Sequence, residues 1–162
     1  MAAAWIAGNA VQAQTPVLPA GSGTVGDPYQ ISELGHLAWM GTNAALSSGQ
    51  YFTLQNDIDA SATTNWNGGA GFMPIGTNDS ARFEGCFDGN GKVINGLSVN
   101  RPLAAYVGFF GVVGGGGLVK NLGLAGAFAR GTNYVGSLVG YNYGTVMDCH
   151  ATASVSGYIN LG

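Results

Sequence analysis

The chain has 162 residues, 46 % of them hydrophobic, which suits one folded domain and excludes global disorder. Only 8 % of the residues are charged and 29 are glycine, which excludes an ordinary helical protein and favours short strands joined by tight turns. The net charge is −3 and the five basic residues are scattered singly, so nucleic acid is not an expected partner. We therefore predict an all-β protein.

The first 25 residues differ from the rest of the chain. Residues 1–13 are small and mostly apolar and end in Val11-Gln12-Ala13, which fits the small-x-small rule of a signal-peptidase site. This indicates the tail of an export signal, with a plain flexible terminus as the alternative. The Pro- and Gly-rich segment that follows is typical of a linker. We expect a signal-like segment and linker over 1–25 and a folded domain over 26–162, without a membrane span because no run of 18 apolar residues occurs.

Two strands and a helix are predicted next along the chain. Residues 28–32 read as a short strand, and Ser32 is placed to cap a helix that extends to Leu46. The alternation in residues 49–60 predicts a half-buried strand. Residues 61–81 read as a loop, anchored by Trp66 and Phe72.

From residue 82 onward, similar phrases recur. "INGLSV" (94–99), "VKNLGL" (119–124) and "VMDCHA" (146–151) are apolar or small at positions one, four and six, and they start 25 and 27 residues apart. We expect each position to form an inward-facing ladder. The predicted core ladders are Ile94, Val119 and Val146, then Leu97, Leu122 and Cys149, then Val99, Leu124 and Ala151.

A second series lies between these phrases, at "YVGFFG" (106–111), "YVGSLVG" (134–140) and "YINLG" (158–162). Repeats of 20 to 50 residues predict an array of stacked units. With strands and Gly turns inside each unit, the array is most simply a β-solenoid with one coil per repeat, about 4.8 Å from the next. The predicted helix would then cover the N-terminal end. Because the chain stops inside "YINLG", we expect further repeats, a partner or self-association at the C-terminal end.

The repeats resemble those of bacterial surface proteins known for the GLUG motif. The resemblance extends over roughly residues 26–162 and rests on "FEGCFDGNGKVINGL" and the two Tyr-Val-Gly phrases. The motif's core falls at Gly108–Gly111 and Ser137–Gly140, with Phe109 in place of Leu and Ser137 in place of Gly. The resemblance implies an extracellular, right-handed parallel β-helix. Such modules occur in adhesin-like proteins and as accessory regions of some immunoglobulin-cleaving metallopeptidases.

Motifs for metal or cofactor chemistry are weak. The "DGNG" at 88–91 does not fit an EF-hand loop, because Val93 and Val99 would stand at its glycine and closing-carboxylate positions. His36 and His150 are the only histidines, and His-Glu-x-x-His does not occur. We expect no metal and no cofactor, and His150 at the surface.

Two other groups of residues are candidate sites. On a strand, Asp57 and Asp59 would share a face about 6.6 Å apart. This is near the separation of the two carboxylates in an inverting glycosidase. Two carboxylates at the end of a strand are more often solvated surface residues. Tyr106, Tyr134 and Tyr158 open successive coils, so an aromatic ladder is predicted. If the ladder lies on an outer face, its rings could contact sugar rings; the alternative is that the tyrosines pack a corner of each coil.

The leading hypothesis is a non-enzymatic secreted or bacterial cell-surface module, adhesin-like, that binds a glycan or a host surface protein or acts as a stalk. One alternative is a carbohydrate-active β-helix enzyme, glycoside hydrolase-like or polysaccharide lyase-like, that uses Asp57 and Asp59. Another is an accessory spacer of an exported metallopeptidase. Cys86 and Cys149 are predicted to be free thiols. If they lie two coils apart, about 9–10 Å separates them, which exceeds the Cα–Cα limit of about 7 Å for a disulfide.

Overall fold

The computed structural model describes residues 15–42 and 49–161. They form short strands and two short helices, α1 (Leu34–Thr42) and the 3-10 helix η1 (Ser61–Gly69). The signal-like residues 1–13 and the expected helical residues 43–46 lie outside the described residues. The strands are β1 (Tyr29–Ile31), β2 (Tyr51–Leu54), β3 (Ile58–Asp59), β4 (Cys86–Asp88), β5 (Val93–Asn95), β6 (Ser98–Asn100), β7 (Phe110–Val113), β8 (Leu118–Lys120), β9 (Gly123–Arg130), β10 (Asn133–Val135), β11 (Val139–Asn142), β12 (Thr145–Met147), β13 (His150–Ser156) and β14 (Ile159–Leu161).

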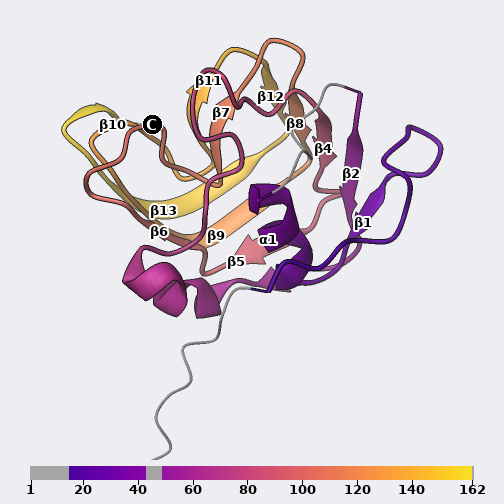
Figure 1. Cartoon of the computed structure of the whole chain (residues 1–162), viewed down its shortest axis with the longest axis horizontal. Coiled ribbons are helices and arrows are strands. Elements are labelled where there is room, and N and C mark those ends of the chain that lie inside the picture. The colour runs from indigo at the N-terminus through magenta and orange to yellow at the C-terminus, as the bar shows by residue number, and fades with distance from the viewer. Residues whose placement is uncertain (1–14, 43–48, 162) are drawn as a thin grey trace, which may run out of the picture.

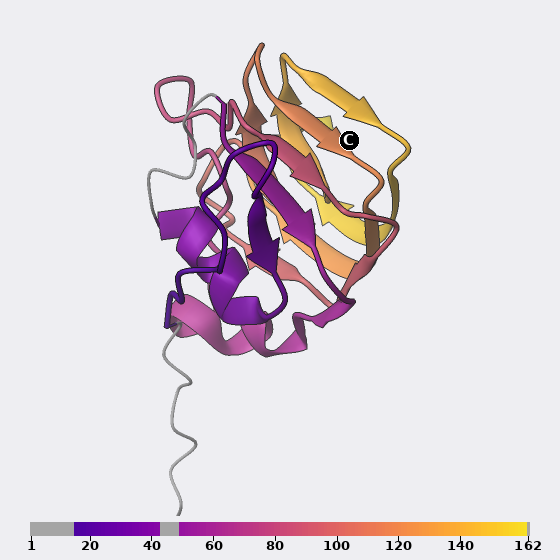
Figure 2. The same ribbon diagram turned by 90° about the vertical axis from the view of Figure 1, so that its right-hand side faces the viewer.

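The strands form four sheets, and every strand pair in the described part of the chain is parallel. The first sheet has the order β1-β2-β4-β8-β12, and the second has β13-β9-β5-β3 with β6 also beside β9 (Figure 1). Two smaller sheets pair β7 with β11 and β10 with β14. The chain visits these sheets in a repeated order, and we call each circuit a coil. Figure 2 shows the coils following one another from purple to yellow.

The interior between the sheets is apolar and rich in phenylalanine. Phe87 lies with its ring centroid 5.7 Å from that of Phe109 and 5.6 Å from that of Phe110, and all three are fully buried. Burying a side chain of this size contributes about 1.5–3 kcal/mol. The alternation predicted from the sequence therefore fills a narrow core.

The pairing of the predicted ladders differs from the expected one in the first coil. Val119 pairs with Val146, as expected, but its partner on the other side is Phe87 rather than Ile94. Ile94 pairs instead with Leu124. The reason is that the aligned phrases lie on different strands: "INGLSV" begins on β5, which pairs with β9, whereas "VKNLGL" begins on β8, which pairs with β4.

The other predicted core residues follow the same shift. Val99 pairs with Ala129 rather than Leu124, and the carbonyl of Leu97 accepts the Phe128 N–H, so Leu97 does not lie beside Leu122. Burial falls along the stack. The six members in the two earlier coils are buried, Val146 and Cys149 are half-buried, and Ala151 is exposed.

The helix α1 lies on the N-terminal side of the stack (Figure 2). Its buried residues are Leu37, Ala38 and Met40, which join the same hydrophobic cluster as Ile31 of β1. The predicted helix thus forms and covers apolar surface at that end. At its start, the backbone N–H of Ser32 donates to His36 Nδ1 at 3.1 Å, in place of the predicted Ser32 side-chain cap.

Two segments expected to be irregular are more ordered. In the expected linker, Val17 donates its N–H to the Gly35 carbonyl, and the Gly23 carbonyl accepts the Tyr51 N–H. This segment therefore packs on the first coil. The expected loop over 61–81 contains η1, and its anchor Trp66 is 5 % exposed. Neither helix in the described ranges is long and apolar enough to span a membrane.

Candidate functional site

Two of the three predicted ladder tyrosines stack on each other. Val107 and Val135 form a parallel bridge between neighbouring coils, which places the preceding residues, Tyr106 and Tyr134, one above the other. Their ring centroids lie 5.0 Å apart and the ring planes differ by 9°. Both side chains are partly exposed.

Tyr141 and Tyr143 extend this pair into a group that we call the tyrosine cluster: Tyr106, Tyr134, Tyr141 and Tyr143. The ring of Tyr141 on β11 meets Tyr134 edge-on at 4.8 Å and Tyr106 at 6.1 Å. Tyr143 follows β11 and lies 4.7 Å from Tyr141. Since Tyr143 is 49 % exposed, the cluster has an accessible aromatic surface.

The loop before β4 adds two charged groups to the cluster. Asp79 accepts hydrogen bonds from the hydroxyls of Tyr106 at 3.4 Å and Tyr143 at 3.3 Å. The Arg82 guanidinium lies over the Tyr143 ring, 5.3 Å from its centroid. Desolvation and the Asp79 carboxylate raise the pKa of both Tyr106 and Tyr143. Both phenols therefore stay protonated as donors around neutral pH.

The backbone at the stacked pair is strained. Tyr106 has φ 58° and Tyr134 has φ 55°, in the left-handed region that bulky residues rarely adopt. At another corner, the same conformation is taken by Asn121 and Asp148, whose short side chains tolerate it. A corner that only needed this φ would be better served by such residues. The stacked pair places two tyrosines in this conformation instead.

The third predicted ladder residue lies elsewhere. β10 and β14 pair with Asn133 opposite Ile159 and Val135 opposite Leu161, so the backbone position opposite Tyr134 is Asn160. Tyr158 is 83 % exposed, and its N–H donates to the Thr132 carbonyl. This backbone register leaves Tyr158 out of line with the other two tyrosines.

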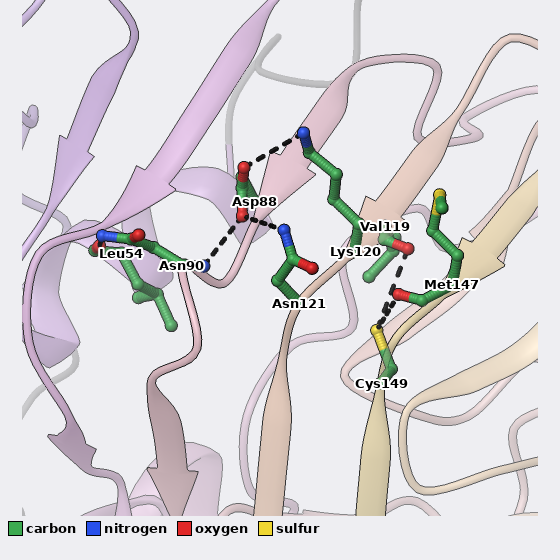
Figure 3. A network of polar contacts seen from close by, with 8 residues as sticks. All are labelled: Leu54, Asp88, Asn90, Val119, Lys120, Asn121, Met147 and Cys149. Atoms are coloured by element: carbon green, nitrogen blue, oxygen red, sulfur yellow. Dashed lines mark hydrogen bonds and ion pairs between the residues drawn. The ribbon is translucent and has the colours of Figure 1, made fainter.

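The "DGNG" segment forms a polar corner with the next coil (Figure 3). Asp88 accepts hydrogen bonds from the backbone N–H of Asn90 at 2.8 Å and from the Asn121 amide at 3.0 Å, and it pairs with Lys120 at 3.1 Å. Burial alone would raise the pKa of Asp88, but these donors together lower it. No cluster of three metal-ligating side chains occurs among the residues described. The corner joins two coils.

Asp57 and Asp59 each contact the backbone. Asp57 Oδ1 accepts the Val93 N–H at 2.8 Å, and Asp59 Oδ1 accepts the Ser61 N–H at 2.9 Å. The hydrogen bonds from Ser61 lower the pKa of Asp59. Both residues are exposed; Asp57 ties the start of β3 to β5 of the neighbouring coil, and Asp59 fixes the turn after β3.

The cysteines are separate free thiols. Cys86 lies opposite Leu118, which in turn lies opposite Thr145, so a whole coil stands between it and the strand that precedes Cys149. Cys149 Sγ lies 3.2 Å from the Met147 carbonyl oxygen (Figure 3). Desolvation raises the pKa of both thiols. His150 is exposed opposite Gly123.

Sequence reasoning missed Tyr141, Tyr143, Asp79 and Arg82. Asp79 and Tyr143 are 64 positions apart, and no local pattern predicts that contact. The Tyr-x-Tyr pair directly after Gly140 was the available signal, because both side chains leave the same face of a strand.

This fold and its motif place the chain among proteins that contain the GLUG motif: the family model "The GLUG motif" matches residues 131–156. The two predicted motif cores lie on each other in register, since Phe110 pairs with Val139. The chain is 39 % identical over 144 residues to "Halomucin" of Haloquadratum walsbyi, which covers 88 % of this chain and 2 % of that protein. It is 41 % identical over 138 residues to "Putative Gly-rich membrane protein" of Evansella cellulosilytica, which covers 83 % of this chain and 16 % of that protein.

Among solved structures, the chain is similar to a crystal structure described as "a putative immunoglobulin A1 protease from Bacteroides ovatus". The TM-score is 0.65 at 24 % identity, and the match covers 82 % of this chain and 40 % of that one. This likeness concerns the fold. The chain spans a small part of both curated relatives and less than half of the solved one.

Proposed function

We propose that this chain is a non-catalytic module of a secreted or cell-surface protein, and that its tyrosine cluster binds glycans in an adhesin-like role. The observation that carries the proposal is the stacked, strained pair Tyr106 and Tyr134 with the accessible ring of Tyr143 beside it. Broad aromatic faces suit the apolar faces of sugar rings, and the hydroxyl tips supply hydrogen bonds. The names of the two curated relatives, a halomucin and a membrane protein, support a surface location.

The form of the module that we propose is a right-handed β-solenoid. Support comes from the parallel coils, because strand–crossover–strand connections within one parallel sheet are right-handed in about 98 % of cases. A solenoid presents a long outer surface on which several sugar units of one chain can lie.

A carbohydrate-active enzyme is the less favoured reading. A structural role for Asp57 and Asp59 is supported by their contacts, since Asp57 accepts the Val93 N–H of the neighbouring coil and Asp59 accepts the Ser61 N–H at a turn. If the enzyme reading is right, the protein releases reducing sugar and Asp57→Asn abolishes that release. A spacer in an exported peptidase predicts neither binding nor release.

The direct test is a glycan array probed with three proteins. The parent and Tyr158→Ala are expected to bind the same glycans, because Tyr158 is exposed outside the cluster. Tyr143→Ala is expected to lose at least about tenfold in affinity, equivalent to about 1.4 kcal/mol, because it removes the accessible ring that would contact the sugar. Equal loss in both variants, or no binding by the parent, would contradict the proposal.

A further inference from the structure

A small groove borders the tyrosine cluster at Tyr106. It has a volume of about 180 Å³, and its walls include Pro74 and Thr77 on one side and Arg101 and Ala104 on the other. Pockets for drug-sized ligands hold about 300–1,000 Å³. This groove therefore has the size for a single ring rather than a whole oligosaccharide.

Arg101 brings an incompletely bonded guanidinium to this groove. Its Nε donates to the Phe72 carbonyl at 3.2 Å, and its backbone N–H donates to the Arg130 carbonyl at 2.8 Å. Its Nη2 finds no acceptor among the residues that the structure describes and is shielded from water, so a ligand in the groove reaches it only when the Arg101 side chain turns toward the groove. A buried donor without an acceptor is destabilising, and more so when it is charged.

The charges around the groove do not neutralise Arg101. The ion pairs found in the described ranges are His36–Glu33 and Lys120–Asp88, both away from it. Asp79, the carboxylate of the tyrosine cluster, accepts hydrogen bonds from two neutral tyrosine hydroxyls and keeps its negative charge. Arg82 adds a second positive charge over Tyr143. Because Arg101 and Arg82 outnumber Asp79, the tyrosine cluster and its groove favour an anionic ligand, although the chain as a whole is acidic.

Building on the proposed glycan binding, we propose that the groove accepts a sugar residue that carries a carboxylate. The sugar ring lies against Tyr106, and the carboxylate accepts hydrogen bonds from Arg101. A planar guanidinium matches a planar carboxylate in geometry, and such charge-assisted bonds are the stronger kind. Hexuronic and sialic acids share this chemistry.

Calorimetric titration with matched ligands tests the proposal. Trigalacturonate carries three carboxylates that are neutral methyl esters in its fully esterified form, and sialyllactose and lactose form a second pair that separates the two kinds of acidic sugar. The parent protein is expected to bind at least one acid about tenfold or more tightly than its neutral counterpart. Equal affinity within both pairs overturns the proposal. If a neutral glycan still binds through the tyrosines, glycan binding survives and only the acidic preference fails.

Two arginine variants locate the effect. Arg101→Gln is expected to abolish the preference for the acid, whereas Arg130→Gln, the same charge change at an exposed side chain, retains it. If both variants lose the preference equally, general charge attraction explains the binding and the site is refuted. Arg101→Lys keeps the charge but not the planar fork and is expected to fall between them. A thermal melt of each variant checks folding, and the parent titration alone remains decisive if Arg101→Gln does not fold.

Discussion

The rings of Tyr106 and Tyr134 stack 5.0 Å apart, although each residue holds its backbone in the left-handed region. The pairing of Val107 with Val135 fixes this relationship, because it brings the same corner of two coils together. Contact with Tyr141 then holds both rings from the side. The fold thus maintains a costly conformation that presents aromatic surface.

Two substitutions of Tyr134 separate the effect of losing the ring from the effect of backbone strain on stability. Both Tyr134→Gly and Tyr134→Ala remove the ring, but only glycine adopts φ 55° without a steric penalty. We expect Tyr134→Gly to be about 1–2 kcal/mol more stable than Tyr134→Ala. Urea denaturation of the two variants measures this difference. A Tyr134→Ala protein as stable as Tyr134→Gly would show that the backbone strain is not real.

The two raised phenol pKa values predict a response to Asp79→Asn. Desolvation and the Asp79 carboxylate raise the pKa of Tyr106 and Tyr143, so the substitution lowers both pKa values. In the parent, the stability from these protonated phenols is complete below about pH 10, the ordinary tyrosine pKa. It is lost as pH rises through the raised values. Absorbance titration at the tyrosinate band measures the change, with Asp27→Asn as a control outside the cluster. Identical titration curves for Asp79→Asn and the parent would contradict the contact.

A glycine inside a motif core and a glycine in the nearby turn at 114–117 are expected to respond differently to Gly→Ala substitution. A Cβ at Gly140 would lie 2.6 Å from the Tyr134 carbonyl oxygen and 2.8 Å from that of Gly111. A Cβ at Gly115 would meet nothing within 4 Å. We therefore expect Gly140→Ala to cost about 1–3 kcal/mol, and Gly115→Ala to be neutral or stabilising by up to about 1 kcal/mol. Thermal melts distinguish them, and equal melting temperatures would refute the close approach of neighbouring coils.

The polar corner predicts acid sensitivity. Because the pKa of Asp88 is lowered, its contribution to stability is present above about pH 3.9, the ordinary Asp value, and is lost as pH falls through the lowered value. Asp88→Asn removes this contribution and leaves Lys120 without its carboxylate. We expect the variant to be less stable than the parent at pH 7 and to lose less stability on acidification. Denaturation midpoints at pH 7 and pH 3 test this, and equal losses in both proteins would contradict it.

The repeat, the strands and the capping helix could be predicted because they follow from local patterns. The alternation around Val119 and Val146 is one example, and its predicted pairing is confirmed. The predicted partner of Ile94 was wrong, since the aligned phrases begin on strands of different sheets: Ile94 lies on β5, which pairs with β9, and Val119 lies on β8, which pairs with β4. The apolar pattern alone does not tell which sheet a short strand joins.

The tyrosine site could be predicted only in part. Tyr106 and Tyr134 repeat in sequence and stack in space, so the pattern was informative. Tyr158 shares the repeat but not the register, because β10 pairs with β14 so that Asn133 lies opposite Ile159. Asp79 reaches the cluster through a loop whose path no periodicity encodes.

The most direct measurement is an NMR titration of protein labelled at its tyrosine rings with a glycan that binds on the array. The chain has seven tyrosines, of which four form the tyrosine cluster and three, Tyr29, Tyr51 and Tyr158, lie outside it. We predict that the ring signals of Tyr106, Tyr134, Tyr141 and Tyr143 shift together with one affinity while the other three stay in place. Shifts confined to Tyr29, Tyr51 or Tyr158 would contradict the account.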